Sequence, residues 1–465
     1  MIGKLPDDVL LKIFRCYLDA FPQFWPTLVH ICRKWRHIVF ASQQALNPRL
    51  FCSPGTPVSK ALDYWPALPI VMEYGGSLEL DHPALENEVD IIAALRQSDR
   101  VISISLTVTN SLRDKLHTVK RPLLGLENLI LLSQDSVLRI PGTFLWGPRL
   151  CRLHLASIDI PSLLRLLRIS RNLEDLQLHD ALNPQYYSIE KLADALSRMT
   201  QLQSLSLHFL STTQYPLIPL LRDKLIVLPA LTHLNLRGTV GHLLPLLDRI
   251  GGPRLGDIQV TLIDGPIFNL SIGNFIDRVE MRNLLRQACI ISSGRAISIS
   301  LTQPGSPTCF NLRSLRESSS RHHQLSDMCY ILDGFSALLP NVEDLRISAT
   351  TQGSGDFGSF RWRGILSMFT GVNWLHLDLN TWEEIVPALR KSIDLWPKHA
   401  GLPSLYKLYL PQPEPCHAPL SEALVSFMTS RWRSGCPIGL EYERPCRRNE
   451  PCGAGTSLFI VCRYH

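Results

Sequence analysis

One spacing pattern recurs along most of the chain and limits how it can fold. An apolar residue is followed by two others, a second apolar residue, one other and a third apolar residue. The clear copies are Val101/Ile104/Leu106, Leu126/Leu129/Leu131, Leu150/Leu153/Leu155, Leu173/Leu176/Leu178, Leu202/Leu205/Leu207 and Leu231/Leu234/Leu236. The weaker copies are Leu255/Ile258/Val260, Ala296/Ile299/Leu301, Val342/Leu345/Ile347, Val372/Leu375/Leu377 and Leu405/Leu408/Leu410. Successive third positions lie 23 to 29 residues apart up to Val260 and 30 to 46 residues apart after it.

This spacing is that of the strand in a leucine-rich repeat, whose unit of about 20 to 29 residues holds one strand and a return segment. The segments between the copies fit helices, and residues 163–167 and 243–247 are near copies of each other. Strand, helix and strand at this period predict parallel strands. We therefore predict an α/β fold with an irregular leucine-rich-repeat solenoid. A doubly wound sheet would alternate in the same way, but eleven copies of one strand motif favour the solenoid.

The residues between the apolar positions of such strands are expected to line the concave face of the sheet. The residue before the third apolar position forms a polar row across the strands, which also includes Gln259 and Ser300. To this row we assign the substrate-binding residues His154, Gln177, Ser206, Asn235, Arg346, His376 and Tyr409. The other interpretation is an ordinary solvated surface, because polar residues also occupy the solvent side of a sheet that binds nothing.

The first 50 residues show helical periodicity instead. Pro6 followed by two aspartates is typical of a helix start, and Leu5, Val9 and Ile13 then recur every four residues, with Leu10 and Phe14 beside them. A second helix is predicted after residue 26, with a basic face opposite its apolar positions. Two short helices cannot bury all of their apolar surface against each other, so we expect some of it to remain for a partner.

Three stretches of this segment, LPDDVL at 5–10, IF at 13–14 and ICRKWR at 31–36, resemble an F-box, the helical motif that docks on the Skp adaptor of cullin-RING ubiquitin ligases. The sequence departs from that motif at residues 19–26, where a leucine-rich helix is usual. The resemblance implies adaptor contacts by Leu5, Pro6, Val9, Leu10, Ile13, Phe14, Ile31 and Trp35. Trp35 has a second candidate role in the core of the module. The other interpretation is a plain helical hairpin packed on the rest of the chain.

Further stretches, including WPALPIV at 65–71, IIAAL at 91–95 and PALTHL at 229–234, resemble fungal F-box proteins with irregular leucine-rich repeats. We predict a small all-α F-box-like module at 1–50, a linker with a first strand at 51–75, the solenoid at 76–440, and a C-terminal segment at 441–465 to which no structure is assigned. The boundary is placed at the Pro- and Gly-rich residues 53–57.

The resemblance implies a substrate-recognition subunit of a Skp–cullin–F-box ubiquitin ligase. Such a subunit would bind the adaptor, and through it a cullin, by the F-box and a protein substrate by the repeats. The alternative is a non-ligase interaction scaffold that uses the solenoid alone.

Composition excludes several other classes. A net charge of +6 in 465 residues, with no basic run interleaved with aromatics, argues against nucleic acid. No apolar run approaches the roughly 18 residues that cross a bilayer, and the N-terminus does not resemble a secretory leader. We expect no membrane partner and a cytoplasmic or nuclear location, where the 12 cysteines would be reduced.

The sequence offers no constellation for catalysis or metal binding. The motifs GxSxG and GxxxxGK[ST] are absent, and the C-terminal cysteines Cys436, Cys446, Cys452 and Cys462 contain no CxxC pair. Histidines are frequent on the predicted strands, but their spacing does not force them to converge on one ion. We therefore expect a non-catalytic protein without cofactor or metal.

Overall fold

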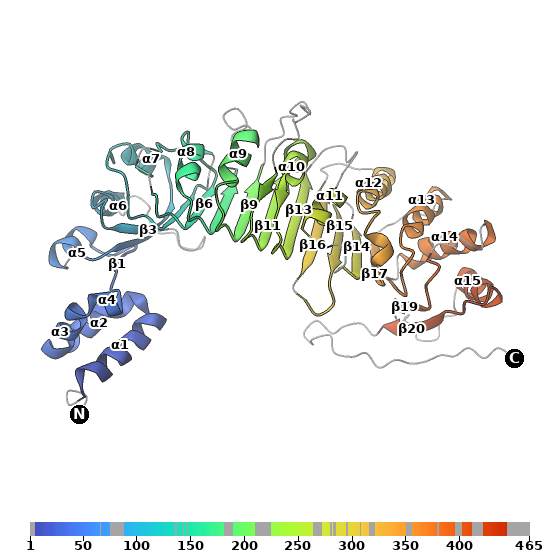
Figure 1. Ribbon diagram of the computed structural model, residues 1–465, viewed down its shortest axis with the longest axis horizontal. Coiled ribbons are helices and arrows are strands. Elements are labelled where there is room, and N and C mark those ends of the chain that lie inside the picture. Colours follow the sequence, from blue (N-terminus) through green and yellow to red (C-terminus); the bar gives the residue numbers. More distant parts are fainter. Residues whose placement is uncertain are drawn as a thin grey trace. The chain divides into compact units, whose positions relative to one another are not determined.

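The structure is a computed structural model of the 465-residue chain (Figure 1). It describes residues 5–65, 67–74, 88–134, 137–142, 144–145, 147–180, 189–209, 225–263, 272–279, 281, 285–293, 296–306, 308–315, 321–349, 356–378, 381–395, 402–411 and 422–443. Most of the predicted C-terminal segment, 441–465, therefore lies outside the described residues. Within these ranges no helix is long and apolar enough to cross a bilayer.

The chain forms two compact units, Met1–Leu202 and Gln203–His465. In the first unit the described main-sheet strands are parallel, in the order β1-β2-β3-β4-β6-β8. Their bounds are β1 Leu50–Cys52, β2 Ile70–Tyr74, β3 Val101–Thr107, β4 Asn128–Leu132, β6 Arg152–Ala156 and β8 Asp175–His179. A small parallel pair joins β5 Leu138–Arg139 to β7 Ile158–Asp159. The connecting helices are α5 Val58–Tyr64, α6 Glu88–Leu95, α7 Asn110–Leu116, α8 Leu163–Ile169 and α9 Ile189–Leu196.

In the second unit the described main-sheet strands follow the order β9-β11-β13-β16-β15-β14-β17-β18-β19-β20. Their bounds are β9 Ser204–His208, β11 His233–Gly238, β13 Asp257–Ile263, β14 Gln287–Ser293, β15 Ala296–Thr302, β16 Cys309–Leu315, β17 Asp344–Ala349, β18 Trp374–Leu377, β19 Lys407–Pro411 and β20 Gly439–Glu443. A small pair joins β10 Ile226–Val227 to β12 Ile250–Gly251. The helices are α10 Val240–Leu247, α11 Ile272–Arg278, α12 Arg321–Asp333, η3 Leu339–Asn341, α13 Asp356–Ser367, α14 Trp382–Leu395 and α15 Glu422–Arg433.

The register of the strands aligns the apolar positions of the repeated motif, and these positions form the core. In the first unit Leu129, Leu153 and Leu176 are cross-strand partners, each at most 1% exposed. In the second unit Leu205, Leu234 and Ile258 are aligned and buried in the same way. Each such side chain contributes about 1.5 to 3 kcal/mol on burial. The prediction of a mixed α/β fold with a mainly parallel, leucine-rich-repeat-like sheet is confirmed, and the side of the sheet away from this core is called the open face below.

The copy Ala296/Ile299/Leu301 was predicted to be one more parallel strand, and this prediction is wrong. It lies on β15, which pairs antiparallel with both β14 and β16. Strand β16 then pairs parallel with β13, and β14 pairs parallel with β17. Only two residues separate β14 from β15 in sequence, whereas a parallel connection needs about a dozen. The antiparallel insertion explains the two longest gaps of the motif, 41 residues before Leu301 and 46 residues after it.

In the described part of the N-terminal module, from residue 5 on, there are four α-helices where two were predicted. These are α1 Asp7–Ala20, α2 Trp25–Ile31, α3 Arg33–Ala41 and the short α4 Gln43–Leu46, with the 3-10 turn η2 Pro22–Phe24 before α2. Cys32 is extended, with φ −160° and ψ 168°, and its carbonyl accepts the first hydrogen bond of α3 from the Arg36 N–H. The predicted single helix through Cys32 is therefore wrong, because apolar spacing continues across a break that only the backbone dihedrals reveal.

The Pro- and Gly-rich residues 53–57 lie between β1 and α5, so the first strand of the sheet precedes them. Trp65 and Leu68, which follow α5, pack on the core of the N-terminal module, where Trp25 and Trp65 contact edge to face at 4.8 Å. The independence of residues 1–50 as a folding unit stays a prediction.

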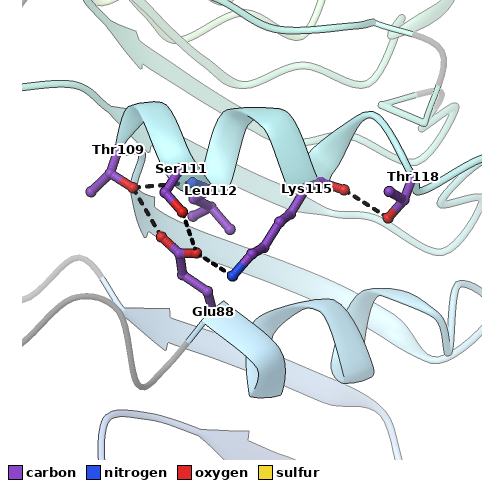
Figure 2. A network of polar contacts seen from close by, with 6 residues as sticks. All are labelled: Glu88, Thr109, Ser111, Leu112, Lys115 and Thr118. Atoms are coloured by element: carbon purple, nitrogen blue, oxygen red, sulfur yellow. Dashed lines mark hydrogen bonds and ion pairs between the residues drawn. The ribbon is translucent and has the colours of Figure 1, made fainter.

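A buried polar network ties α6 to α7 in the first unit (Figure 2). Glu88, 2% exposed, forms an ion pair with Lys115 at 2.6 Å and accepts hydrogen bonds from Ser111 Oγ at 2.8 Å and Thr109 Oγ1 at 3.2 Å. Thr109 also caps α7 by accepting from the Leu112 N–H. Burial alone raises the pKa of Glu88, but these hydrogen bonds outweigh it and lower the pKa. The carboxylate is thus a structural link between two repeats and is fully partnered.

Candidate functional site

The predicted adaptor-binding residues of α1 divide between the surface and the core. Val9 is 36% and Ile13 48% exposed, one helical turn apart, and Pro6 before them is also exposed. Leu10 and Phe14 are 1% and 0% exposed and belong to the core of the module. Leu10 and Phe14 thus lie on the inner side of this amphipathic helix, and their assignment to adaptor contact stays a prediction.

The other three predicted contacts occupy intermediate or exposed positions. Ile31, at the end of α2, is 54% exposed. Leu5 and Trp35 are half-buried, and the Trp35 ring lies 4.7 Å from that of Phe14. Trp35 thus packs against the module's own core, which was its second candidate role.

The sequence interpretation missed two further exposed aromatic residues of the N-terminal module. Phe21 is 48% and Phe24 46% exposed, and their rings lie 6.2 Å apart, with Tyr17 5.7 Å from Phe21. Both lie in the segment where the sequence departs from the F-box pattern. The signal that could have found them is the density of aromatic residues around Pro22, which a globular loop rarely exposes without use.

A lysine of α3 fixes the start of α1. Lys34 Nζ lies 3.0 Å from Asp7 Oδ1 and donates to the Leu5 carbonyl at 2.8 Å. The Pro6 carbonyl accepts the first α1 hydrogen bond from the Leu10 N–H. The partly exposed ion pair itself is worth only about 0 to 1 kcal/mol. The ion pair nevertheless holds the start of α1 against α3, and so fixes where the exposed apolar side chains of α1 lie relative to α3.

In the first unit the polar row brings together two predicted residues, His154 and Gln177, which are cross-strand partners. Gln177 Nε2 donates to Asp175 on its own strand at 3.2 Å, and the His154 ring lies 5.3 Å from that of His179. Burial lowers the pKa of His154, against the opposing charge of Asp175. Across β4 the row continues in Ile130, so it is not polar throughout.

The first strands of the second unit align the amide side chains of Asn235 and Gln259 with Ser206. Ser206 is only 8% exposed, whereas Gln259 is exposed. The next member is Asn311 on β16, followed by Ser300 on the antiparallel β15 and Cys289 on β14. Asn311 and Cys289 were missed because no copy of the motif was assigned to β14 or β16, although Leu285/Ala288/Ile290 keeps its spacing on β14 and is buried.

The last strands of the second unit align Arg346, His376 and Tyr409, as predicted, and add Glu441 on β20. The rings of His376 and Tyr409 stack with centroids 4.2 Å apart and planes 3° from parallel. His376 Nε2 lies 3.2 Å from Asp344 Oδ1, and Lys407 Nζ lies 2.9 Å from Glu441 Oε1. Burial, reinforced by Glu441, raises the pKa of Tyr409, and the hydrogen bond to Glu441 raises the pKa of Lys407.

The described residues contain no group of three or more His, Cys, Asp or Glu side chains placed to hold a metal ion. The cysteines in these ranges are free thiols, and Cys436 is exposed, whereas Cys446, Cys452 and Cys462 lie outside the described residues. The described surfaces include exposed apolar side chains on the N-terminal module and a row of mostly polar side chains on the open face.

Comparison with known proteins does not assign a family. No protein-family model matches the chain, and no curated protein matches it. Among solved structures the chain is similar to TLR13, from a complex with ssRNA13, at 13% identity and a TM-score of 0.29 over 76% of this chain. It spans 44% of that chain, well under two thirds of its length. It is also similar to the leucine-rich repeat-containing protein LegL7 from Legionella pneumophila, at 13% identity and a TM-score of 0.26 over 83% of this chain and 97% of that one. Both likenesses are too distant to bear on function, so the repeat architecture rests on this chain's own strands.

Proposed function

We propose that the protein is the substrate-recognition subunit of a Skp–cullin–F-box ubiquitin ligase. In this proposal the N-terminal module docks on the adaptor and the open face of the sheet binds the protein substrate. Such a subunit accelerates transfer by raising the local concentration of substrate near the charged conjugating enzyme, and it performs no chemistry itself.

The observation that carries the proposal is the exposed apolar surface of the module. Val9, Ile13 and Ile31 are 36%, 48% and 54% exposed although Leu10 and Phe14 complete a buried core beneath them. A small helical module with a complete core does not need further apolar residues at its surface for folding. These positions coincide with part of the F-box resemblance and suit helix-on-helix docking with an adaptor.

The test is the double change Val9→Asp with Ile13→Asp, followed by co-purification with a Skp adaptor. Both positions face solvent, so the module should stay folded while two carboxylates oppose the partner's apolar surface. Burying an unpaired charge costs several kcal/mol, so we expect co-purification to fall below detection. A change at Leu10 would be a poor test, because it would unfold the module.

The matched control adds the same two charges at exposed polar positions of α4, as Gln43→Asp with Gln44→Asp. This variant should bind the adaptor as the intact chain does. If the Val9/Ile13 variant is folded and still binds the adaptor, or if the intact chain never binds it, the ligase proposal fails. An interaction scaffold that uses the repeats alone then takes its place.

A further inference from the structure

The open face of β9, β11, β13 and β16 carries a second row beside the polar row. Arg237 on β11, Thr261 on β13 and Arg313 on β16 are consecutive cross-strand partners. Because partners in register project to the same side, the two guanidinium groups flank the threonine hydroxyl. These three residues are called the basic patch.

No described carboxylate pairs with either guanidinium group of the basic patch. Among the described residues no carboxylate forms an ion pair with Arg237 or Arg313, whereas Arg286 elsewhere in this unit pairs with Glu343 at 2.8 Å. The Nε atom of Arg237 is buried and makes no hydrogen bond, while Arg313 is exposed. A buried donor without a partner costs free energy, so this arrangement favours a ligand that supplies an acceptor.

The surroundings of the basic patch select the type of ligand. The adjacent row presents Asn235, Gln259 and Asn311, whose amides can hydrogen-bond to a peptide backbone. Asp257 is the one carboxylate that the described open-face positions of these four strands hold, and it accepts from Cys309 Sγ and Gln259 Nε2. The same described positions hold no Phe, Tyr or Trp on which a nucleic-acid base could stack. An acidic peptide fits this chemistry better than single-stranded nucleic acid does.

The strand register also fixes the distance between the two arginines of the basic patch. Arg237 and Arg313 stand two strands apart, or about 10 Å at the backbone. A polyproline-II segment places residues i and i+3 on one side, about 9.3 Å apart. Each guanidinium can bind a carboxylate through two parallel N–H···O bonds.

We propose that the basic patch binds an extended acidic segment of the protein substrate, with carboxylate side chains three residues apart facing Arg237 and Arg313. This inference rests on the proposed function, which assigns substrate binding to the repeats. It adds the chemical class of the segment and the strands on which that segment lies.

The experiment measures binding of a fluorescent peptide of Glu-Pro-Pro repeats to the full chain by anisotropy. A peptide of Gln-Pro-Pro repeats is the matched probe without charge. We expect the Glu peptide to bind, the Gln peptide to bind at least about tenfold more weakly, and added salt to weaken the Glu peptide further.

The variant Arg237→Gln with Arg313→Gln should weaken Glu-peptide binding at least about tenfold, and the exposed Arg313→Gln alone about threefold or more. The matched control, Arg254→Gln with Arg433→Gln, removes the same charge at exposed positions outside the basic patch and should bind the peptide normally. Equal binding of the Glu and Gln peptides, or unchanged Glu-peptide binding in both basic-patch variants, would overturn the inference. Tight binding of oligouridylate that depends on the same arginines would also overturn it, in favour of nucleic acid.

Adaptor binding is measured on the same preparations. If the adaptor binds and the Glu peptide does not, only the acidic-segment inference is lost. If the Glu peptide binds through the basic patch and the adaptor does not, the inference holds for an interaction protein and the ligase proposal is lost.

Discussion

The open face of the second unit has two regions that use their charges differently. On β9, β11, β13 and β16 the guanidinium groups of Arg237 and Arg313 have no carboxylate partner among the described residues. On the strands from β14 to β20 two open-face carboxylates are already engaged with neighbouring cations. These ion pairs are Asp344–His376 at 3.2 Å and Glu441–Lys407 at 2.9 Å.

The two regions also differ in aromatic content. Trp374 and Tyr409 lie on the later strands, where Tyr409 stacks on His376, whereas the described open-face positions of β9, β11, β13 and β16 hold no Phe, Tyr or Trp. Exposed Arg346 joins this second region as a cation available to a ligand. The difference teaches that one repeated backbone can present either charges neutralised within the chain or charges left for a partner.

The largest effect is expected from shortening a buried leucine under each region, which tests whether the core is packed equally well beneath both. Leu236 lies beneath the first region and Leu375 beneath the second, each 0% exposed. Changing either to Ala should lower the free energy of unfolding by about 2 to 5 kcal/mol through lost burial and a residual cavity. Chemical denaturation of each variant gives the value. An effect below about 1 kcal/mol at one site would mean that the core under that region is not packed as described.

A second, smaller effect is the difference in stability lost when a paired charge of the second region or an unpaired charge of the first region is removed. Asp344 is 8% exposed, pairs with His376 and accepts from Gln287 Nε2 at 3.3 Å. Asp344→Asn should therefore destabilise the chain by about 1 to 3 kcal/mol. Arg313→Gln removes an exposed and unpaired charge and should change stability by less than about 0.5 kcal/mol. Denaturation midpoints of both variants, measured under the same conditions, give the two losses of stability. Equal losses would contradict the claim that charges are paired in the second region and unpaired in the first.

The repeats were predictable from sequence because a buried strand position tolerates few residue types, so Leu, Ile and Val recur at fixed spacing. That spacing placed Arg346, His376 and Tyr409 in one row, as observed. It did not reveal strand direction, since alternation such as Ile297-Ser298-Ile299-Ser300 suits parallel and antiparallel strands equally. The antiparallel insertion was missed for this reason, and Asn311 and Cys289 with it.

The candidate docking surface was predictable only in part. The four-residue recurrence placed Val9 and Ile13 correctly on one face of α1, but it could not tell that Leu10 and Phe14 face inward. Which side of an amphipathic helix is buried depends on the helices packed against it, and these include α2 and α3 on either side of the extended Cys32. The basic patch was not predicted at all, because a missing ion pair is a property of spatial neighbours and leaves no trace in residue spacing.

The smallest expected effect is a difference in pH response between the two regions. In the repeats that carry the first region, His242 on the connecting helix α10 is 5% exposed, stacks on Phe209 and shares a hydrogen bond with Thr239 Oγ1. Burial lowers the pKa of His242 below its usual 6.5. In the second, the pKa values of Tyr409 and Lys407 are raised above 10.0 and 10.5.

These shifts act at opposite ends of the pH scale. Between the folded pKa of His242 and 6.5 the unfolded chain binds a proton that the folded chain excludes, so stability decreases as pH falls through this window and is complete above it. Above about pH 10 the folded chain holds protons on Tyr409 and Lys407 that the unfolded chain releases, so stability there decreases as pH rises. His242→Gln keeps a hydrogen-bonding side chain but cannot titrate, and it should reduce the drop in melting temperature between about pH 7.5 and about pH 5.5. The exposed His233→Gln is the matched control and should leave that drop unchanged. If both variants lose stability toward acid as the intact chain does, the acid response originates outside the first region and His242 has no part in it.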